Sequence, residues 1–210
     1  RSAYFQAELL GSRVPVEKVR ERNTLSASEV AAFDRIADVK EYGKEIGLKA
    51  TDNYDTYADG WDRTIWNLTA CPELDFKPVT WNFPIVGKVP YLGFFRREDA
   101  NAWAQRLQNN GNEIHLRTAG AYSTLGWFRD PILPGMLKWN DYQLANTVLH
   151  ELAHATLWIK GSVSFNESFA SFIGDKAAFE YLEDRFGIDS VEYQTAAQRH
   201  ADLHTWRLLL

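Results

Sequence analysis

The stretch from Val148 to Phe172, VLHELAHATLWIKGSVSFNESFASF, holds two histidines four residues apart, with a glutamate directly after the first. Residues four apart lie on one face of an α-helix, so His150 and His154 would present their imidazoles side by side. Two nitrogens placed in this way can reach one metal ion at about 2.0–2.1 Å. Glu151 is turned by roughly 100° from His150, where a general base can lie beside the metal without binding it. The stretch therefore predicts a catalytic metal site on a helix.

A catalytic zinc site has three protein ligands and one open position. The best candidate for the third ligand is Glu167, thirteen residues after His154. Gly161 permits a tight reversal after the first helix, which places Glu167 in the first turn of the next one. A carboxylate at that end of a helix is stabilised by about 0.3–1 kcal/mol. If the two helices pack antiparallel, His150, His154 and Glu167 meet around one Zn²⁺ ion.

Other histidines and acids fit this role less well. Lys160 stands where a metzincin would carry its third histidine, and His115 lies on an expected strand upstream. His200 and His204 repeat the four-residue spacing without a glutamate between them. This pair is interpreted as solvent-facing or structural, with a second metal site as the alternative.

The same pattern also occurs by chance in ordinary helices, where the histidines and the glutamate have no common role. Here the surrounding helix is apolar on more than one face, which indicates that it is buried. Buried histidines and glutamates need polar partners. Metal ligation supplies such partners, so the metal site is the preferred interpretation. The apolar residues are Leu144, Val148, Leu149, Leu152, Ala153, Ala155, Leu157, Trp158 and Ile159.

The rest of the chain predicts an α+β fold in one domain over residues 1–210, with a small mixed or antiparallel sheet followed by a helical half. Ser26 and Glu29 have capping-box spacing at the start of a helix that ends at Gly47. Aromatic and β-branched residues broken by Pro and Gly indicate strands within 62–95 and at 112–120. Further helices are expected over 97–111, from Asn140 to Gly161, from 164–166 to Gly187, and from Asp189, capped with Glu192, towards Leu210.

Composition narrows the classes of function. The 210 residues carry a net charge of -5, without the basic stripe that nucleic-acid binding requires. No run of 18 or more apolar residues occurs, so no membrane-spanning helix is expected. Cys71 is the single cysteine, which excludes an internal disulfide and a Cys-rich zinc finger.

Three long motifs resemble the bacterial family of zinc metallopeptidases called putative aminopeptidases. They are HELAHATLWIKGSVSFNESFASF, AYSTLGWFRDP and WNFPIVGKVPYLGFF, and the similarity begins near YFQAELLGSRVPVEKV and includes YADGWDRTIWNLTACPE. The resemblance implies a zincin-like fold and a gluzincin-type site, with His150, His154 and Glu167 on zinc and Glu151 as catalytic acid and base. It also implies a peptide substrate and a place in the cell envelope.

This chain departs from the family pattern in several places. Family members commonly begin with a lipoprotein-type signal and extend further at the C-terminus, so the chain is expected to be truncated at both ends. Some members carry a cysteine where this chain has Lys88. The large zinc aminopeptidases recognise a free α-amino group with an acidic residue, and the comparable segment GAYSTLGW has none. Exopeptidase and endopeptidase specificity therefore both stay open.

Hydrolysis at such a site also needs a hydrogen-bond donor for the developing oxyanion. Tyr122, on a segment that reads as an edge strand, is the first candidate, and Tyr181 and Tyr193 are alternatives. Asp130 and Asn166 are candidates for orienting the histidines. A turn-forming role for Asp130 and a helix N-cap role for Asn166 are equally consistent with the sequence.

One rival interpretation is non-catalytic. The zinc would then be a structural clamp in a peptide-binding or envelope scaffold module. Structural zinc sites usually fill all four positions with protein ligands and have no use for a base such as Glu151. The sequence therefore favours the enzyme.

Overall fold

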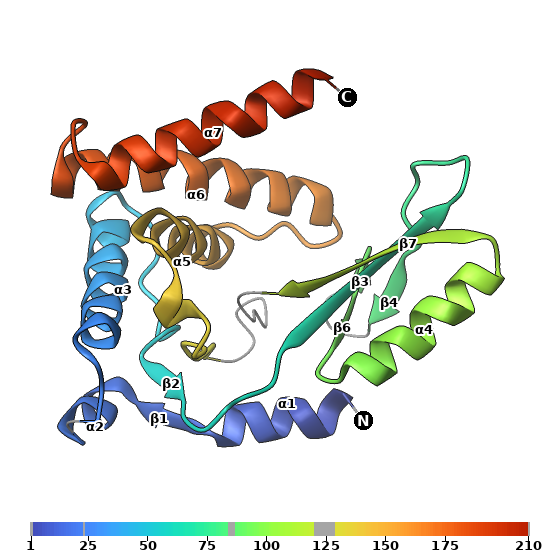
Figure 1. Cartoon of the computed structure of the whole chain (residues 1–210), viewed down its shortest axis with the longest axis horizontal. Coiled ribbons are helices and arrows are strands. Elements are labelled where there is room, and N and C mark those ends of the chain that lie inside the picture. Colours follow the sequence, from blue (N-terminus) through green and yellow to red (C-terminus); the bar gives the residue numbers. More distant parts are fainter. Residues whose placement is uncertain (1, 23, 84–86, 120–128, 210) are drawn as a thin grey trace. The chain divides into compact units, whose positions relative to one another are not determined.

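The computed structural model describes residues 2–22, 24–83, 87–119 and 129–209 (Figure 1). Helices and small antiparallel sheets are both present, so the expected α+β class is confirmed. The chain forms two compact units, here called the first unit (1–21, 53–135 and 159–163) and the second unit (22–52, 136–158 and 164–210). The expectation of one metallopeptidase domain over 1–210 stays a prediction.

The first unit contains the described strands and three helices. A three-stranded antiparallel sheet has the order β6-β3-β7, and α4 packs against it. Leu68 of β3 pairs with Leu92 and Leu116 on its two neighbours, and Phe94 lies in the same apolar cluster. The elements are α1 (Ser2–Gly11), β1 (Arg13–Pro15), α2 (Val16–Glu21), β2 (Thr56–Ala58), β3 (Ile65–Pro72), β4 (Trp81–Phe83), β5 (Gly87–Val89), β6 (Leu92–Phe94), α4 (Arg97–Asn109) and β7 (Asn112–Ala119).

The second unit is helical. Its elements are α3 (Ala27–Glu45), the short 3₁₀ helix η1 (Met136–Lys138), α5 (Asp141–Thr156), α6 (Val163–Phe186, whose first residue is counted with the first unit) and α7 (Val191–Leu209). The capping box of Ser26 and Glu29 starts α3 as expected, and a second one, Asn140 with Gln143, starts α5. The apolar face of α5 packs against α3, so α5 lies in the core of this unit.

Helix α5 ends at Thr156, before the expected stop at Gly161. The hydroxyl of Thr156 donates to the carbonyl of Leu152 and accepts from the backbone N–H of Lys49, and Leu157 is extended. A contact with a segment distant in sequence therefore ends the helix, and the pattern of residues around 156 could not reveal it. Gly161 does adopt a positive φ of 83°, as a reversal requires.

Two further helix starts differ from expectation. Helix α6 begins at Val163, so Glu167 lies in its second turn and Asn166 is inside the helix, which makes the N-cap role for Asn166 wrong. Helix α7 begins at Val191, and Ser190 accepts a hydrogen bond from the N–H of Tyr193. Ser190, rather than Asp189, therefore supplies the cap.

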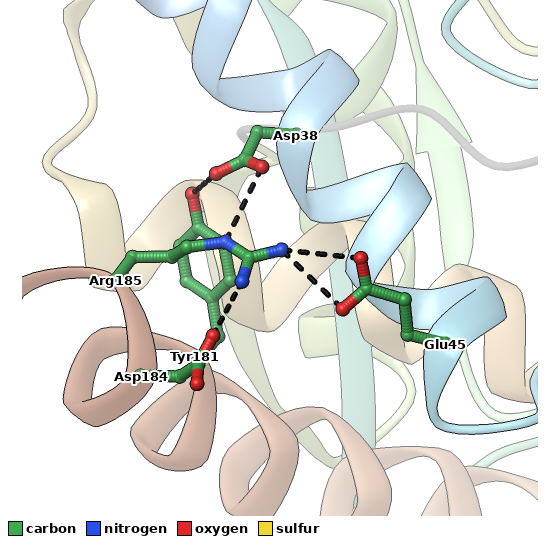
Figure 2. A network of polar contacts seen from close by, with 5 residues as sticks. All are labelled: Asp38, Glu45, Tyr181, Asp184 and Arg185. Atoms are coloured by element: carbon green, nitrogen blue, oxygen red, sulfur yellow. Dashed lines mark hydrogen bonds and ion pairs between the residues drawn. The ribbon is translucent and has the colours of Figure 1, made fainter.

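A polar network joins α3 to α6 (Figure 2). Tyr181 donates its hydroxyl proton to Asp38 at 2.7 Å. Arg185 approaches Asp38 and Glu45 at 3.4 Å each and also pairs with Asp184. Burial and the bond to Asp38 raise the pKa of Tyr181, so its hydroxyl stays protonated and can donate. The network therefore fixes the end of α6 that is distant in sequence from Glu167.

Replacing Tyr181 with Phe is expected to lower the free energy of unfolding by about 1–2 kcal/mol. A hydrogen bond to a charged acceptor contributes roughly 1.5–3 kcal/mol, and Arg185 still contacts Asp38 in the variant. Urea unfolding measures the change, and the metal content of the folded variant should equal that of the wild type. An unchanged unfolding midpoint would show that the bond adds nothing.

Candidate metal centre

Helix α5 places the two histidines on one face, as their spacing predicts. Their ring centroids lie 4.6 Å apart in an edge-on arrangement. His154 is buried, with 6% of its surface exposed, whereas His150 is partly exposed. On the other sides of α5, buried residues including Leu149 and Leu152 pack into the core. The apolar packing therefore fixes the helix, and the helix fixes the direction of both imidazoles.

Helix α6 runs antiparallel to α5 and brings Glu167 to the histidines. Tyr142 at the start of α5 donates a hydrogen bond to Asp175 in the middle of α6, whereas His154 near the end of α5 meets Glu167 close to the start of α6. Glu167 approaches Nε2 of His150 at 3.7 Å with one oxygen and Nε2 of His154 at 3.6 Å with the other. The three side chains that the sequence selected therefore converge.

This geometry fits one metal ion. One atom from each of the three side chains lies within 4.8 Å of the other two. Tetrahedral ligands at about 2.0–2.1 Å from zinc are about 3.4 Å apart, close to the observed separations of 3.6 and 3.7 Å. The group formed by His150, His154 and Glu167 could thus hold a metal ion with small side-chain adjustments.

The electrostatics of the group also suit a cation. Contacts with His150 and His154 lower the pKa of Glu167 to about 2, against an opposing contribution from burial. The carboxylate is therefore ionised near neutral pH, which is the form that binds metal.

The comparisons with known proteins agree with this geometry. The family model described as "Putative aminopeptidase" matches residues 1–209. The chain belongs to this family. No curated protein and no solved structure matched the chain.

Of the remaining site residues expected for this aminopeptidase family, the structure describes Glu151, Tyr181 and Tyr193 but not Tyr122. Glu151 lies on α5 between the histidines and is partly exposed, and its role as general base stays a prediction. Tyr122 lies outside the described residues. Tyr181 is fully buried and donates to Asp38, and the ring of Tyr193 packs against Phe179. The hydroxyl of Tyr181 is thus engaged in the network of Figure 2.

The two candidates for orienting the histidines are both buried. Asn166 has no exposed surface and directly precedes Glu167 in α6. Asp130 is equally buried, and its backbone N–H donates to the side chain of Asn53. Their orienting role stays a prediction.

The second nitrogen of His154 stands apart from the ligand contacts. Its Nδ1 is buried and has no hydrogen-bond partner among the described residues, while the ring lies edge-on to Trp158 at 5.4 Å. A metal-ligating histidine normally donates this second N–H to an oxygen. For Nδ1 of His154, the described residues provide no such acceptor.

Two structural residues near the site were missed in the sequence. Asp175 of α6 lies 3.4 Å from Nε2 of His200 on α7, so tertiary folding supplies an acidic partner from another helix. Gly174, in the middle of α6, packs directly on His150. A glycine inside a long helical pattern is itself a signal of close packing and could have identified it.

In the described part of the chain, no helix is long and apolar enough to cross a membrane. The expectation drawn from the hydropathy of the sequence is consistent with this finding. Membership of the aminopeptidase family implies a peptide as substrate.

Proposed function

We propose that this protein is a zinc-dependent peptide hydrolase with a zincin-like fold and a gluzincin-type site. The observation that carries the proposal is the convergence of His150, His154 and Glu167, with both Nε2–carboxylate distances near 3.6–3.7 Å, in a chain of the aminopeptidase family. Two imidazoles and one carboxylate are the ligand set of zinc peptidases that keep a fourth position open.

Zinc is favoured over other divalent ions by the chemistry of the donors. Imidazole suits zinc and other transition metals, whereas magnesium and calcium take oxygen ligands almost throughout. The carboxylate of Glu167 is ionised near neutral pH, which is the form that binds a metal cation. One Zn²⁺ per chain is therefore proposed.

Glu151 and Tyr122 have separate roles in the proposed hydrolysis. A zinc ion held by the three ligands supplies Lewis acidity for the scissile carbonyl and lowers the pKa of water to about 7. Glu151 takes the proton of the attacking water and passes it to the leaving amine. Tyr122 donates a hydrogen bond to the substrate oxygen as negative charge develops there.

Metal content and peptide cleavage test this function together. The purified protein is expected to carry about one zinc ion per chain and to cleave members of a peptide library. A chelator should abolish cleavage, and added zinc should restore it. Matched peptides with free and acetylated N-termini distinguish aminopeptidase from endopeptidase activity, because only an aminopeptidase requires the free amine.

The same experiment separates the rival interpretation. Bound zinc without cleavage of any peptide would favour a zinc-stabilised scaffold module. Cleavage that persists after complete zinc removal would reject the metal mechanism.

A further inference from the structure

Gly174 lies in helix α6, close against the backbone of helix α5. It is the twelfth residue of a 24-residue helix and is buried. Glycine inside a helix costs about 0.5–1 kcal/mol relative to alanine, so this position needs a compensating reason. Ala170 and Ala178, one turn to either side on the same face, are also fully buried. Small residues on this face of α6 leave room for a neighbouring helix, and at Gly174 that neighbour is α5.

The contacts at Gly174 show how little space remains. A Cβ atom at this position would lie 2.8 Å from the backbone oxygen of Asn146, 3.0 Å from Cβ of His150 and 3.2 Å from Cα of His150. These atoms belong to the α5 backbone and to the root of a side chain, so no rotamer change can move them aside. A methyl group at Gly174 would therefore push α5 and α6 apart at His150.

The same interface holds the candidate metal ligands. Glu167 is seven residues before Gly174 on α6, which is about 10 Å along the helix axis. His150 contacts both Gly174 and Glu167, so any separation of the helices at Gly174 acts directly on the spacing of two ligands. Metal–ligand distances tolerate only about 0.2 Å of change.

We propose that Gly174 is a positioning residue, which sets the spacing between α5 and α6 so that His150 and Glu167 reach the same metal ion. The proposal rests on the proposed metal site. It assigns to Gly174 a role in metal affinity, in addition to its effect on packing.

Gly43 supplies a matched control on a different side of α5. A Cβ at Gly43, in helix α3, would lie 2.6 Å from Cδ1 of Leu152 and 3.3 Å from Cδ2 of Leu149. These atoms are the ends of flexible side chains, which can rotate without moving the α5 backbone. Gly43→Ala therefore crowds the core to a similar degree and leaves the ligands in place.

The test compares zinc affinity in the wild type, Gly174→Ala and Gly43→Ala. Zinc affinity is measured by competition with a chromophoric chelator, and the Co²⁺ absorption spectrum reports the coordination geometry. Gly174→Ala is expected to bind zinc about 10–100-fold more weakly and to change the Co²⁺ spectrum. Gly43→Ala is expected to keep wild-type affinity and spectrum, even if its unfolding midpoint falls.

Equal affinity of Gly174→Ala and the wild type would overturn the proposal, and so would an equal loss in Gly43→Ala. If Gly174→Ala does not fold, Ala170→Val is the second test. It adds two methyl groups to the face of α6 that carries Gly174, one turn away. Its expected result is also weaker zinc binding, and unchanged affinity would overturn the proposal. A wild type that binds no zinc would instead refute the proposed function itself.

Discussion

Glu151→Gln is expected to lower kcat for peptide hydrolysis by about 10²–10⁴-fold while the zinc content stays at the wild-type level. Glutamine keeps the size of the side chain but cannot take a proton from water. Glu151 follows His150 on α5, one position off the face that carries the two histidines, so its replacement leaves the ligand set intact. Steady-state kinetics with a cleaved peptide, combined with metal analysis, measures both quantities.

Glu183→Gln is the matched control for this variant. Glu183 is an exposed glutamate on α6, and the same chemical change there should leave kcat and zinc content unaltered. Normal hydrolysis by Glu151→Gln would show that another group is the base. Loss of zinc together with activity would show instead that Glu151 supports the metal.

Glu167→Gln is expected to lose zinc rather than to impair proton transfer. The three ligands share a binding free energy of roughly 10–16 kcal/mol for zinc in protein sites, so the loss of one corresponds to about 3–5 kcal/mol. This amounts to about 10²–10⁴-fold weaker binding. The charged carboxylate is the form present near neutral pH, and His150 and His154 lower its pKa further, to about 2. The neutral amide of glutamine cannot replace this charge.

Competition with a chelator measures this loss, and thermal unfolding provides an independent measurement. Zinc at about 1,000 times its Kd should stabilise the wild type by about 4 kcal/mol and should stabilise Glu167→Gln far less. Glu183→Gln, on the same helix, should respond to zinc as the wild type does. Equal zinc stabilisation of all three proteins would exclude Glu167 from the ligand set.

Local patterns in the sequence predicted local features well. The capping box of Ser26 and Glu29 is formed, and the four-residue spacing of His150 and His154 puts both rings on one face. Such features depend on neighbours within one helical turn, so the residue types alone carry the information. The choice of Glu167 as the partner of the histidines was also possible, because only one short reversal separates the helices.

Features that depend on distant segments were predicted poorly. The end of α5 at Thr156 depends on Lys49, and the acidic partner of His200 comes from Asp175 on another helix. The expected position of Glu167 in the first turn of its helix was wrong, since α6 begins at Val163. The effect of the helix dipole falls off within the first turn, and the contacts that lower the pKa of this carboxylate are those with the two imidazoles.

The sequence by itself determined which side chains are candidates for ligands and base, since helical periodicity places His150, Glu151 and His154 without reference to the rest of the chain. Only the tertiary structure decided that Glu167 comes within 3.6–3.7 Å of both histidines. That approach depends on how closely two helices pack. A glycine in a helix signals close packing, but only the tertiary structure shows that Gly174 packs against His150.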